Sequence, residues 1–363
     1  MNIPLFRQVA CVLLLAAGVA CGADNTPASL IAAGHFKQAR TLLEKRIAEN
    51  PKDADTLVLL ARVRLAYQEH EEASRLLLQA LAIQPEHSDA HLYMAEMYSQ
   101  KVDHVGVFEK AGVAKKIRFE AERALAANPR NIDALETLLD FHLEAPRMVG
   151  GDKGKAAELA EKIARLDPVR GYFAKAEIAA KEKHHDRQEA LLEQAVIADP
   201  QSYAALVAAA DLYLTGLYAK DRTLSYAKAT DYARKALAVD DGRVRAYATL
   251  AEAYAAQQQW AQLEDTLAAA DKAVPDDASP YFRAGNALLV TGRQPARAET
   301  YFRKYLSQEP EGEAPTQAVA HWRLGLALEK QGRKAEAIQE IQMAVKMKPG
   351  LKEAKKDLDR LKG

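Results

Sequence analysis

The sequence predicts an all-α protein, a right-handed α-solenoid of about nine helix-turn-helix hairpins that ends in a C-terminal capping helix. Three observations lead to this expectation. Ala, Leu, Glu, Lys and Gln are frequent while alternating strand patterns are scarce, which favours helix throughout. Proline recurs at a regular interval along the chain. Small and apolar residues recur in one order before each of these prolines, so a single helical unit is repeated.

The recurring proline sets the length of the unit. Its intervals run from 32 to 44 residues, and all but one equal or exceed a base of 34 residues, as insertions into a repeat would produce. Asp241 takes the place of proline once. We therefore expect the array over residues 26–349, with units that close near Pro51, Pro85, Pro129, Pro168, Pro200, Asp241, Pro275, Pro310 and Pro349.

Two apolar stripes with helical spacing make up each unit. In the second unit the first stripe contains Leu57, Leu60 and Ala61, and the second contains Ala73 and Leu77. Each stripe needs a partner helix, so the two stripes predict a hairpin. Small residues are expected where the backbones of two helices approach closely, and a larger side chain there should cost about 1–3 kcal/mol. These small residues are Ala61, Ala80, Gly325 and Ala344.

The order of residues in these units resembles the tetratricopeptide repeat. The last unit has Trp322, Leu324, Gly325, Ala337, Ile341, Ala344 and Pro349 in that order, and similar series precede Pro275 and Pro310. Gly34 and Gly332 each stand five residues before an alanine that starts the next stripe, as expected of a tight turn. The resemblance covers nearly everything after residue 28. It implies that the first helix of each hairpin lines a concave groove.

Three units are longer than the base repeat, and the chain has a distinct end. The extra residues fall around residues 99–114, 146–154 and 215–224, between the two expected helices of a hairpin. Insertions at one place in a repeat emerge on one face, which makes that rim a candidate for recognition, although tolerated loop drift is the alternative. Residues 350–363 carry Leu351, Ala354, Leu358 and Leu361 at helical spacing and predict the capping helix.

The first 23 residues read as a signal peptide. Arg7 precedes an apolar run from Val9 to Ala20, which small residues follow. This run is shorter than the roughly 20 residues that span a bilayer, so we expect export, with an uncleaved anchor as the alternative. The segment before Cys21 resembles a bacterial lipobox, with Gly18 where leucine is usual. Lipidation of Cys21 and plain cleavage near it both stay open, which predicts a periplasmic protein or one anchored by lipid to the outer membrane.

Composition and motifs argue against several classes of function. Lys plus Arg and Asp plus Glu number 50 each, so no overall charge attracts nucleic acid. The common metal, thiol, acyl-transfer and phosphate-binding motifs do not occur, and we expect no enzyme, no cofactor and no metal. Gly150-Gly151-Asp152 is expected to form a turn and a helix cap. His184 and His185 are expected in a surface turn, since adjacent side chains diverge.

The resemblance assigns a candidate surface to residues beside the core stripe on the first helices. An acidic run with a tyrosine is expected to accept a basic or extended peptide, and an arginine and aromatic patch to hold a carboxylate or stack a ring. The Lys and Asn pattern that clamps a terminal carboxylate in some relatives is not present. The acidic run is Asp89, Tyr93, Glu96, Asp133, Glu136, Asp140 and Glu144; the other patch is Arg245, Phe282, Arg283, Asn286, Trp322 and Arg323.

Two functions follow from this surface. The first is a non-catalytic adaptor that holds protein or peptide partners of the cell envelope in its groove. The second is capture of a small ligand, as in repeat proteins associated with TRAP-type transport, with Trp322 and Phe282 in the pocket. An enzyme is the third and least favoured reading, because it would need groups from distant repeats to converge.

Overall fold

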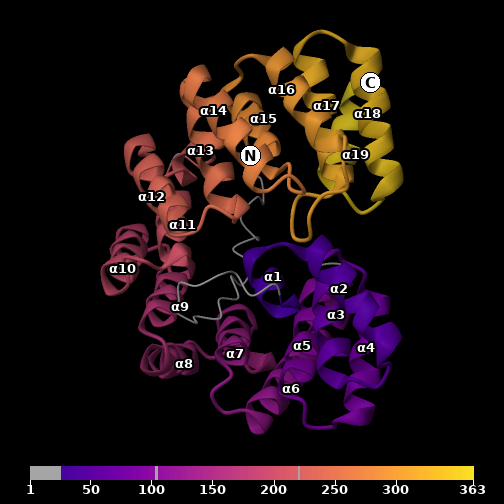
Figure 1. Cartoon of the computed structure of the whole chain (residues 1–363), viewed down its shortest axis with the longest axis vertical. Helices are drawn as coiled ribbons and strands as arrows, with labels where there is room; N and C mark the ends of the chain where they lie inside the picture. Colours follow the sequence, from indigo (N-terminus) through magenta and orange to yellow (C-terminus); the bar gives the residue numbers. More distant parts are fainter. Residues whose placement is uncertain (1–25, 103–104, 220) are drawn as a thin grey trace. The chain divides into compact units, whose positions relative to one another are not determined.

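The computed structural model describes residues 26–102, 105–219 and 221–363. Within these residues all regular structure is helical, with α-helices numbered α1 to α19 and no strand, so the all-α prediction is confirmed. Helices α1 to α18 pair in chain order as nine hairpins, and α19 follows alone (Figure 1). The chain divides into two compact units, residues 1–199 (unit 1) and 200–363 (unit 2).

Unit 1 holds the first five hairpins. A short 3-10 helix, η2, stands between the two helices of the fourth hairpin. The elements are α1 (Pro27–Ala33), α2 (Phe36–Glu49), α3 (Ala54–Ala66), α4 (His70–Ile83), α5 (Ser88–Lys101), α6 (Val107–Ala127), α7 (Ile132–Glu144), η2 (Arg147–Val149), α8 (Lys153–Leu166), α9 (Pro168–Lys181) and α10 (His185–Ala198).

Unit 2 holds the last four hairpins and the final helix. Another 3-10 helix, η3, follows the first helix of the sixth hairpin. The elements are α11 (Tyr203–Leu212), η3 (Thr215–Leu217), α12 (Tyr226–Val239), α13 (Val244–Gln257), α14 (Trp260–Ala273), α15 (Ser279–Thr291), α16 (Pro295–Leu306), α17 (Gln317–Lys330), α18 (Lys334–Met347) and α19 (Lys352–Lys362).

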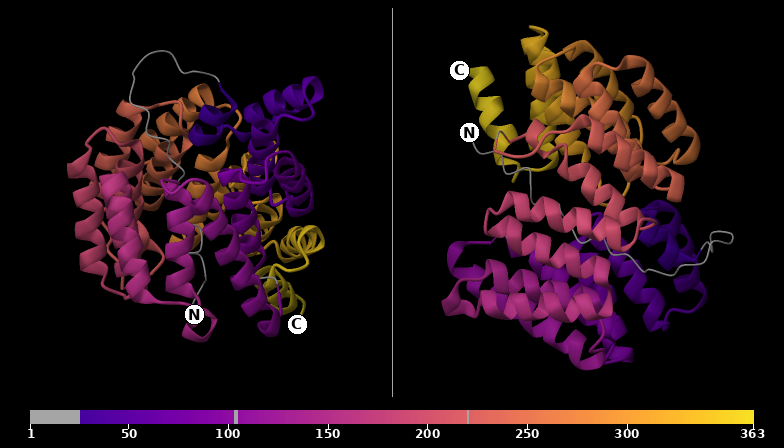
Figure 2. Two further views of the ribbon diagram at one scale, coloured as in Figure 1. Left: turned by 90° about the horizontal axis from the view of Figure 1, so that it is seen from below. Right: turned by 90° about the vertical axis from the view of Figure 1, so that its left-hand side faces the viewer.

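Successive first helices, the odd-numbered ones from α1 to α17, pack against one another within each unit. The pairs α3–α5, α5–α7 and α7–α9 make contact in unit 1, as do α11–α13, α13–α15 and α15–α17 in unit 2, whereas successive second helices hardly touch. The helices of each unit are stacked in chain order (Figure 2). The first helices therefore form a continuous layer in each unit, and this layer carries the candidate surface.

Small residues lie where the helices of a hairpin meet. Ala61, Ala80 and Ala344 are completely buried. A Cβ atom added at Gly325 would come within 2.4 Å of Ile341 Cγ1 on the facing helix α18. The predicted contact points are thus confirmed, because these backbones approach more closely than larger side chains allow.

The turns within hairpins follow the sequence prediction, while one junction between hairpins departs from it. Gly34 and Gly332 adopt φ of +92° and +78°, the left-handed region that glycine enters without strain. Pro168 lies two residues after the end of α8 at Leu166, as the other recurring prolines lie after their helices, and it is also the first residue of α9, where the missing N–H costs nothing. Beyond Pro310 the chain continues without helix as far as Thr316, a linker that the repeat pattern did not predict.

The three predicted insertions fall in the third, fourth and sixth hairpins. In each hairpin the insertion lies where its first helix ends and its second begins. In the third hairpin α6 begins at Val107 and reaches 21 residues, so much of this insertion is helix. In the sixth hairpin the inserted loop is held by the backbone, since Gly216 N–H donates to the Thr223 carbonyl at 2.9 Å and Ser225 N–H to the Tyr213 carbonyl at 2.8 Å. The loop is therefore an ordered part of unit 2.

The predicted capping helix is present as α19. Its apolar residues Ala354, Leu358 and Leu361 are buried in the core of unit 2. The opposite side carries lysines and acidic residues that remain exposed, which covers the last hairpin with a polar surface.

The predicted signal peptide, residues 1–23, and Cys21 lie outside the described residues. Among the residues that are described, no helix has the length and apolar character to cross a bilayer.

Candidate functional site

All thirteen residues predicted for the candidate surface lie on first helices. Asp89, Tyr93 and Glu96 belong to α5, and the four acidic residues 133, 136, 140 and 144 belong to α7. In unit 2, Arg245 lies on α13, residues 282, 283 and 286 on α15, and residues 322 and 323 on α17. Their use in partner binding stays a prediction, and the contacts they make inside the molecule are described below.

The acidic residues of α5 already have partners on the neighbouring first helices. Asn131 Nδ2 donates to Asp89 Oδ1 at 2.9 Å. Glu96 lies 3.7 Å from Arg62 Nη1, and the Arg62 guanidinium also lies over the Tyr93 ring, 6.0 Å from its centroid. Burial raises the pKa of Asp89 and of the Tyr93 hydroxyl. At this end of the acidic run Glu96 is therefore paired with Arg62 of α3, and Asp89 is hydrogen-bonded by Asn131, the residue that caps α7.

Arg170 on α9 is the centre of the acidic run. Its Nε donates to Glu136 Oε1 at 2.9 Å and its Nη2 to Glu136 Oε2 at 2.5 Å, while Asp133 accepts a further bond from Nη2. The Arg170 side chain is only 8% exposed, so these charge-assisted bonds are shielded from water. Burial raises the pKa of Glu136 to about 7, because the pairing with Arg170 opposes it only in part.

Two carboxyl groups face each other farther along the same helices. Burial and the nearby Glu177 raise the pKa of Asp140, and burial raises the pKa of Glu177 as well. Asp140 Oδ1 is enclosed and finds no donor, which a proton held between the two carboxyls would supply. Lys181 pairs with Glu144 one turn away. Neither Arg170 nor Glu177 was identified from the sequence.

The patch in unit 2 is centred on Arg283. Its Nη2 pairs with Glu252 on α13 and lies 3.0 Å from Asp211 Oδ1 on α11. Glu252 is 1% exposed. Burial alone would lower the pKa of Arg283, but Glu252 and Asp211 raise it above its ordinary value. Arg283 therefore stays charged and joins three successive first helices.

Asp211 holds two further groups of α13. Thr249 Oγ1 donates to Asp211 Oδ1 at 2.7 Å, and Arg245 Nε donates to Oδ2 at 2.8 Å. Burial opposes the charge of Asp211, yet Arg245 and Arg283 outweigh it and lower the pKa of this carboxyl. The predicted residues Arg245 and Arg283 thus meet in one network through Asp211.

The inserted loop of the sixth hairpin contributes Tyr218 to this network. The Tyr218 hydroxyl donates to Glu252 Oε1 and accepts a bond from Asn286 Nδ2 at 3.2 Å. Burial and the charge of Glu252 raise the pKa of Tyr218 well above its ordinary value. The insertion therefore completes a polar cluster on the first helices, while its role in recognition stays a prediction.

The two predicted aromatic residues are part of the core. Phe282 packs against Phe302 and Tyr305, with ring centroids 5.6 and 5.1 Å apart. Trp322 is 7% exposed, and its Nε1 donates to Asp357 Oδ2 of α19 at 2.9 Å. Arg323 lies over the Trp322 ring at 4.2 Å. These rings stabilise unit 2, and their role in ligand binding stays a prediction.

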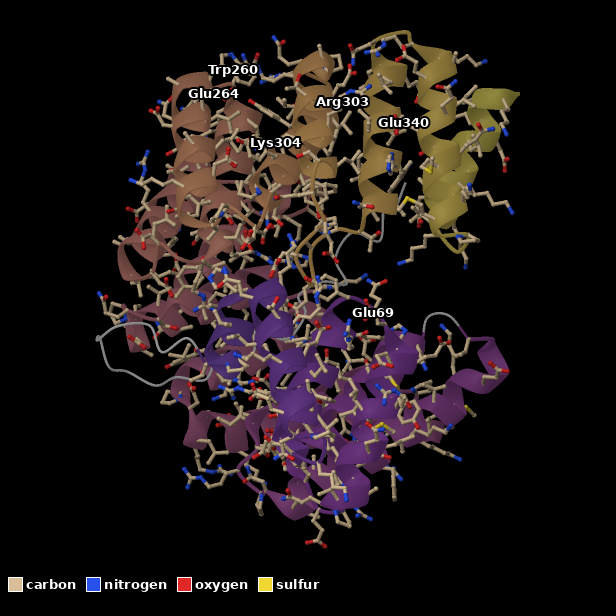
Figure 3. The ribbon with its side chains drawn as sticks, turned by 45° about the vertical axis from the view of Figure 1, so that its right-hand side comes forward. Glu69, Trp260, Glu264, Arg303, Lys304 and Glu340 are labelled. Carbon is tan, nitrogen blue, oxygen red and sulfur yellow. The ribbon has the colours of Figure 1, made fainter. Side chains whose placement is uncertain are left out.

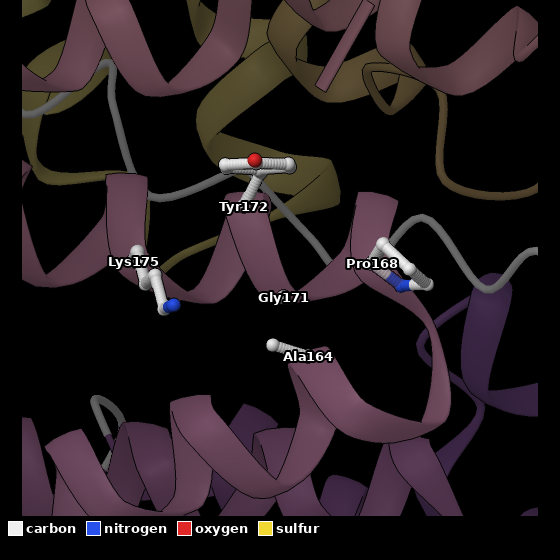
Figure 4. A pocket seen from close by; sticks show the side chains of 5 residues that line it. All are labelled: Ala164, Pro168, Gly171, Tyr172 and Lys175. Carbon is white, nitrogen blue, oxygen red and sulfur yellow. The ribbon is translucent and has the colours of Figure 1, made fainter. Parts of the chain in front are cut away.

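A shallow hollow lies elsewhere, at the crossing of α8 and α9. It is lined by Ala164, Pro168, Gly171, Tyr172 and Lys175 (Figure 4). A Cβ atom at Gly171 would come within 2.3 Å of Ala164 Cβ and 2.9 Å of Ala164 N. The hollow is therefore the edge of a very close helix crossing and contains none of the predicted site residues.

The glycine and histidine motifs serve local structure. Gly150 has φ of +110°, and Asp152 Oδ1 accepts bonds from Gly154 N at 2.8 Å and Lys155 N at 3.3 Å, which confirms the turn and the cap. His184 precedes α10 and lies 3.5 Å from Glu182. In residues 26–102, 105–219 and 221–363, no three His, Cys, Asp or Glu side chains converge as metal ligands would.

The second helices present a different surface. On α14 and α16 of unit 2, Glu264, Arg303 and Lys304 keep 58%, 48% and 47% of their side chains exposed (Figure 3). Their ion pairs are therefore screened by water, unlike those of Arg170 and Arg283.

Comparison with family models finds two matches, each described as a tetratricopeptide repeat. One covers residues 30–97 at the start of unit 1, and the other covers residues 282–352 near the end of unit 2. Comparison with curated proteins finds no match.

Several solved structures are similar to parts of the chain. A thermophilic TPR protein of Thermus thermophilus, TTC0263, is 21% identical with a TM-score of 0.45, covering 51% of this chain and 94% of its own. Yeast Tom70 is 14% identical with a TM-score of 0.49, covering 93% of this chain and 80% of its own. Pseudomonas aeruginosa PilF is 17% identical with a TM-score of 0.36, covering 62% and 94%.

The helix pairs, the small residues at their crossings and the two family matches lead to one conclusion. Repeats of this kind are typically non-catalytic and generally form protein-interaction scaffolds. The chain contains tetratricopeptide repeats, which the family models match over residues 30–97 and 282–352.

Proposed function

We propose that the protein is a non-catalytic adaptor of the bacterial envelope that binds a protein or peptide partner on its first helices. One observation carries the proposal: the polar residues of this layer are held in place by buried ion pairs between successive first helices, as around Arg170 and Arg283. Side chains that are already fixed lose little entropy when a partner binds. Such a surface suits an extended or helical segment.

Unit 1 offers the surface for a basic or extended segment. Carboxylates outnumber cations along α5, α7 and α9, and the Asp140–Glu177 pair has no arginine between its members. A cation from a partner would compensate this excess in a partly buried place, where its attraction is stronger than at an open surface.

The partner-binding proposal is tested by capture from envelope extracts. The wild-type protein is compared with the variant D133N/E144Q, which removes two carboxylate charges while keeping the shape of both side chains. We expect the wild type to retain partners that the variant loses, as read by crosslinking in intact cells and mass spectrometry. The matched control is E158Q/E161Q on the second helix α8, which should keep them. Identical partners for all three proteins would exclude this surface.

Export rests on the composition of residues 1–23, and the proposal places the protein in the periplasm or on the outer membrane through Cys21. Fractionation of cells that express the full chain tests the location. Metabolic labelling with a palmitate analogue tests lipidation: label on the wild type that is lost in Cys21→Ser supports the anchor, and export without label supports plain cleavage. A full-length chain in the cytoplasm would refute both.

The alternative of small-ligand capture for TRAP-type transport gains no support from the aromatic residues proposed for it. Phe282 and Trp322 are packed in the core of unit 2, with 8% and 7% exposure. A thermal shift produced by a metabolite mixture on purified protein would favour that alternative.

A further inference from the structure

The polar contacts between first helices in unit 2 follow a register that repeats from hairpin to hairpin. Each of these helices has a small residue at the equivalent place of the repeat, namely Ala210, Ala251, Gly285 and Gly325. On α11 and α13 the residue directly after the small one contacts the next first helix. Its partner there stands two places before the small residue of that helix. Pairs formed by these two positions are called rungs below.

The first two rungs each contain a carboxylate. Asp211, directly after Ala210, accepts the hydroxyl of Thr249, two places before Ala251, at 2.7 Å. Glu252, directly after Ala251, pairs with Arg283, two places before Gly285. Each carboxylate in these rungs is therefore satisfied by the next first helix along the chain.

The third rung has a cation but no carboxylate. Asn286 directly follows Gly285 on α15, and Arg323 stands two places before Gly325 on α17, which packs against α15. Tyr218 is close to both, because its hydroxyl accepts the Asn286 amide and its charge would act on Arg323. Asn286 thus occupies the place that Glu252 has in the rung before, and an amide cannot neutralise a guanidinium.

Arg323 is buried without a hydrogen-bond partner. The residue is 8% exposed, its Nε is completely enclosed, and no described residue accepts a bond from it. Its terminal nitrogens are not enclosed in this way. Asp357 and Glu353 of α19 act on it only from a distance, and Asp357 is engaged by Trp322 and Arg360. Asn286 Oδ1 is likewise enclosed and accepts no bond.

A buried cation without an acceptor is costly, and burial lowers the pKa of Arg323. A carboxylate would compensate the charge of Arg323 most effectively, because its two oxygens match the geometry of a guanidinium. An N–H group beside that carboxylate would satisfy Asn286 Oδ1. An acidic residue in a peptide has both groups, a side-chain carboxylate and a backbone N–H.

We propose that an Asp or Glu side chain of the bound partner completes the third rung by pairing with Arg323 beside Asn286. This proposal rests on the proposed function, since it names the chemistry of one contact in a partner-binding surface. Under this proposal, unit 2 binds an acidic segment of the partner.

The first experiment uses the purified full chain and acetate as the simplest carboxylate. Melting temperatures are compared in sodium acetate and sodium chloride of equal ionic strength at pH 7. The wild type should melt at a higher temperature in acetate, because binding to the folded state stabilises it. Arg323→Gln should lose this difference. Asn286→Asp should also lose it, and should melt above the wild type in chloride, because it supplies the carboxylate that the third rung lacks.

Equal melting of the wild type in the two salts would overturn the proposal, as would an acetate effect that persists in Arg323→Gln. Asn286→Asp serves as the second variant that keeps the test valid if Arg323→Gln fails to fold. This measurement needs no partner protein, so it fails or succeeds independently of capture from envelope extracts.

The second experiment separates a peptide carboxylate from a free one. A blocked pentapeptide with one glutamate between alanines is titrated beside its glutamine counterpart and beside acetate. The wild type should bind the glutamate peptide about tenfold more tightly than the glutamine peptide, as expected for one charge-assisted pair, and more tightly than acetate. A glutamate peptide that binds no better than acetate would assign Arg323 to free carboxylates and overturn its assignment to a partner side chain.

Discussion

The first helices of the two units leave opposite charges uncompensated. In unit 1, Asp140 and Glu177 oppose each other, and burial raises the pKa of both. In unit 2, Arg323 is buried without an acceptor while Asp211 and Glu252 are fully paired. One repeat architecture thus carries two chemically different surfaces. The difference arises from single positions, because one carboxylate gained or lost on a first helix changes the sign of the charge that is left uncompensated.

The largest effect is expected at Arg283. Arg283→Met leaves Asp211 with Arg245 alone and leaves the buried Glu252 without a cation. Removing one partner of a buried pair costs about 3–5 kcal/mol, so unit 2 should lose most of its stability while unit 1 keeps its own. Hydrogen exchange followed by mass spectrometry measures both units in one sample.

The matched control is Arg297→Met on the second helix α16. Arg297 pairs with Glu264 at 3.0 Å, but both side chains are more than one third exposed. Exposed pairs contribute about 0–1 kcal/mol. Equal loss of protection in the two variants would contradict the buried network as the source of stability.

An intermediate effect is expected where small residues separate the helices. Gly171→Ala should destabilise unit 1 by about 1–3 kcal/mol, because the new Cβ would meet the backbone of Ala164. Gly325→Ala should cost unit 2 less, since its first contact is Ile341 Cγ1, which can move by side-chain rotation. Urea unfolding followed by circular dichroism measures both free energies.

Gly112→Ala provides the control for helix propensity. Gly112 lies within α6 with open space around its Cβ position. Alanine there should stabilise the protein by about 0.5–1 kcal/mol. A stabilising Gly171→Ala would show that α8 and α9 separate at little cost.

The smallest effect concerns the pH dependence of unit 1. A carboxyl whose pKa is raised by folding contributes stability at pH below its unfolded pKa and loses it as pH rises through the folded pKa. Asp140→Asn removes one such group and lets the amide donate to Glu177. The variant should match the wild type near pH 4 and exceed it in stability at pH 8, because the raised pKa of Asp140 penalises only the ionised carboxyl.

Urea unfolding at several pH values tests this prediction, with exchange of residues 130–180 as the local readout. Glu136, whose pKa burial raises to about 7, also contributes to the pH dependence of both proteins. A difference between variant and wild type that does not grow with pH would show that Asp140 and Glu177 do not share a proton.

Much of the fold could be predicted because it depends on local spacing. The recurring prolines, the buried Ala61 and Ala80, and the glycine turns at Gly34 and Gly332 are properties of single hairpins. Pro168 marks the end of the fourth unit as predicted, but the sequence did not show that it also begins α9, because a proline is compatible with both places. The linker before Thr316 was missed because it adds length outside the hairpins.

The candidate site could be predicted only in part. Sequence spacing placed Arg283 and Asn286 on the correct helix but could not show what faces them, since their partners Glu252 and Tyr218 come from other hairpins. The signal was present for one of these: Glu252 stands after Ala251 as Asn286 stands after Gly285. Comparing equivalent positions between neighbouring repeats would have found the Arg283 pair, whereas Tyr218 lies in an insertion that no repeat matches.

Asp167 joins the fourth hairpin to the fifth without any loop. Its N–H donates to the Ile163 carbonyl at 2.8 Å and ends α8, while its side chain accepts the Arg170 N–H at 3.0 Å and starts α9. Extra residues spliced in at this point would detach both helix ends and displace the arginine that holds the acidic run. An engineered tag or fluorescent reporter therefore belongs in a turn such as the one at the exposed Asp241, whereas any insertion at residue 167 should disable unit 1.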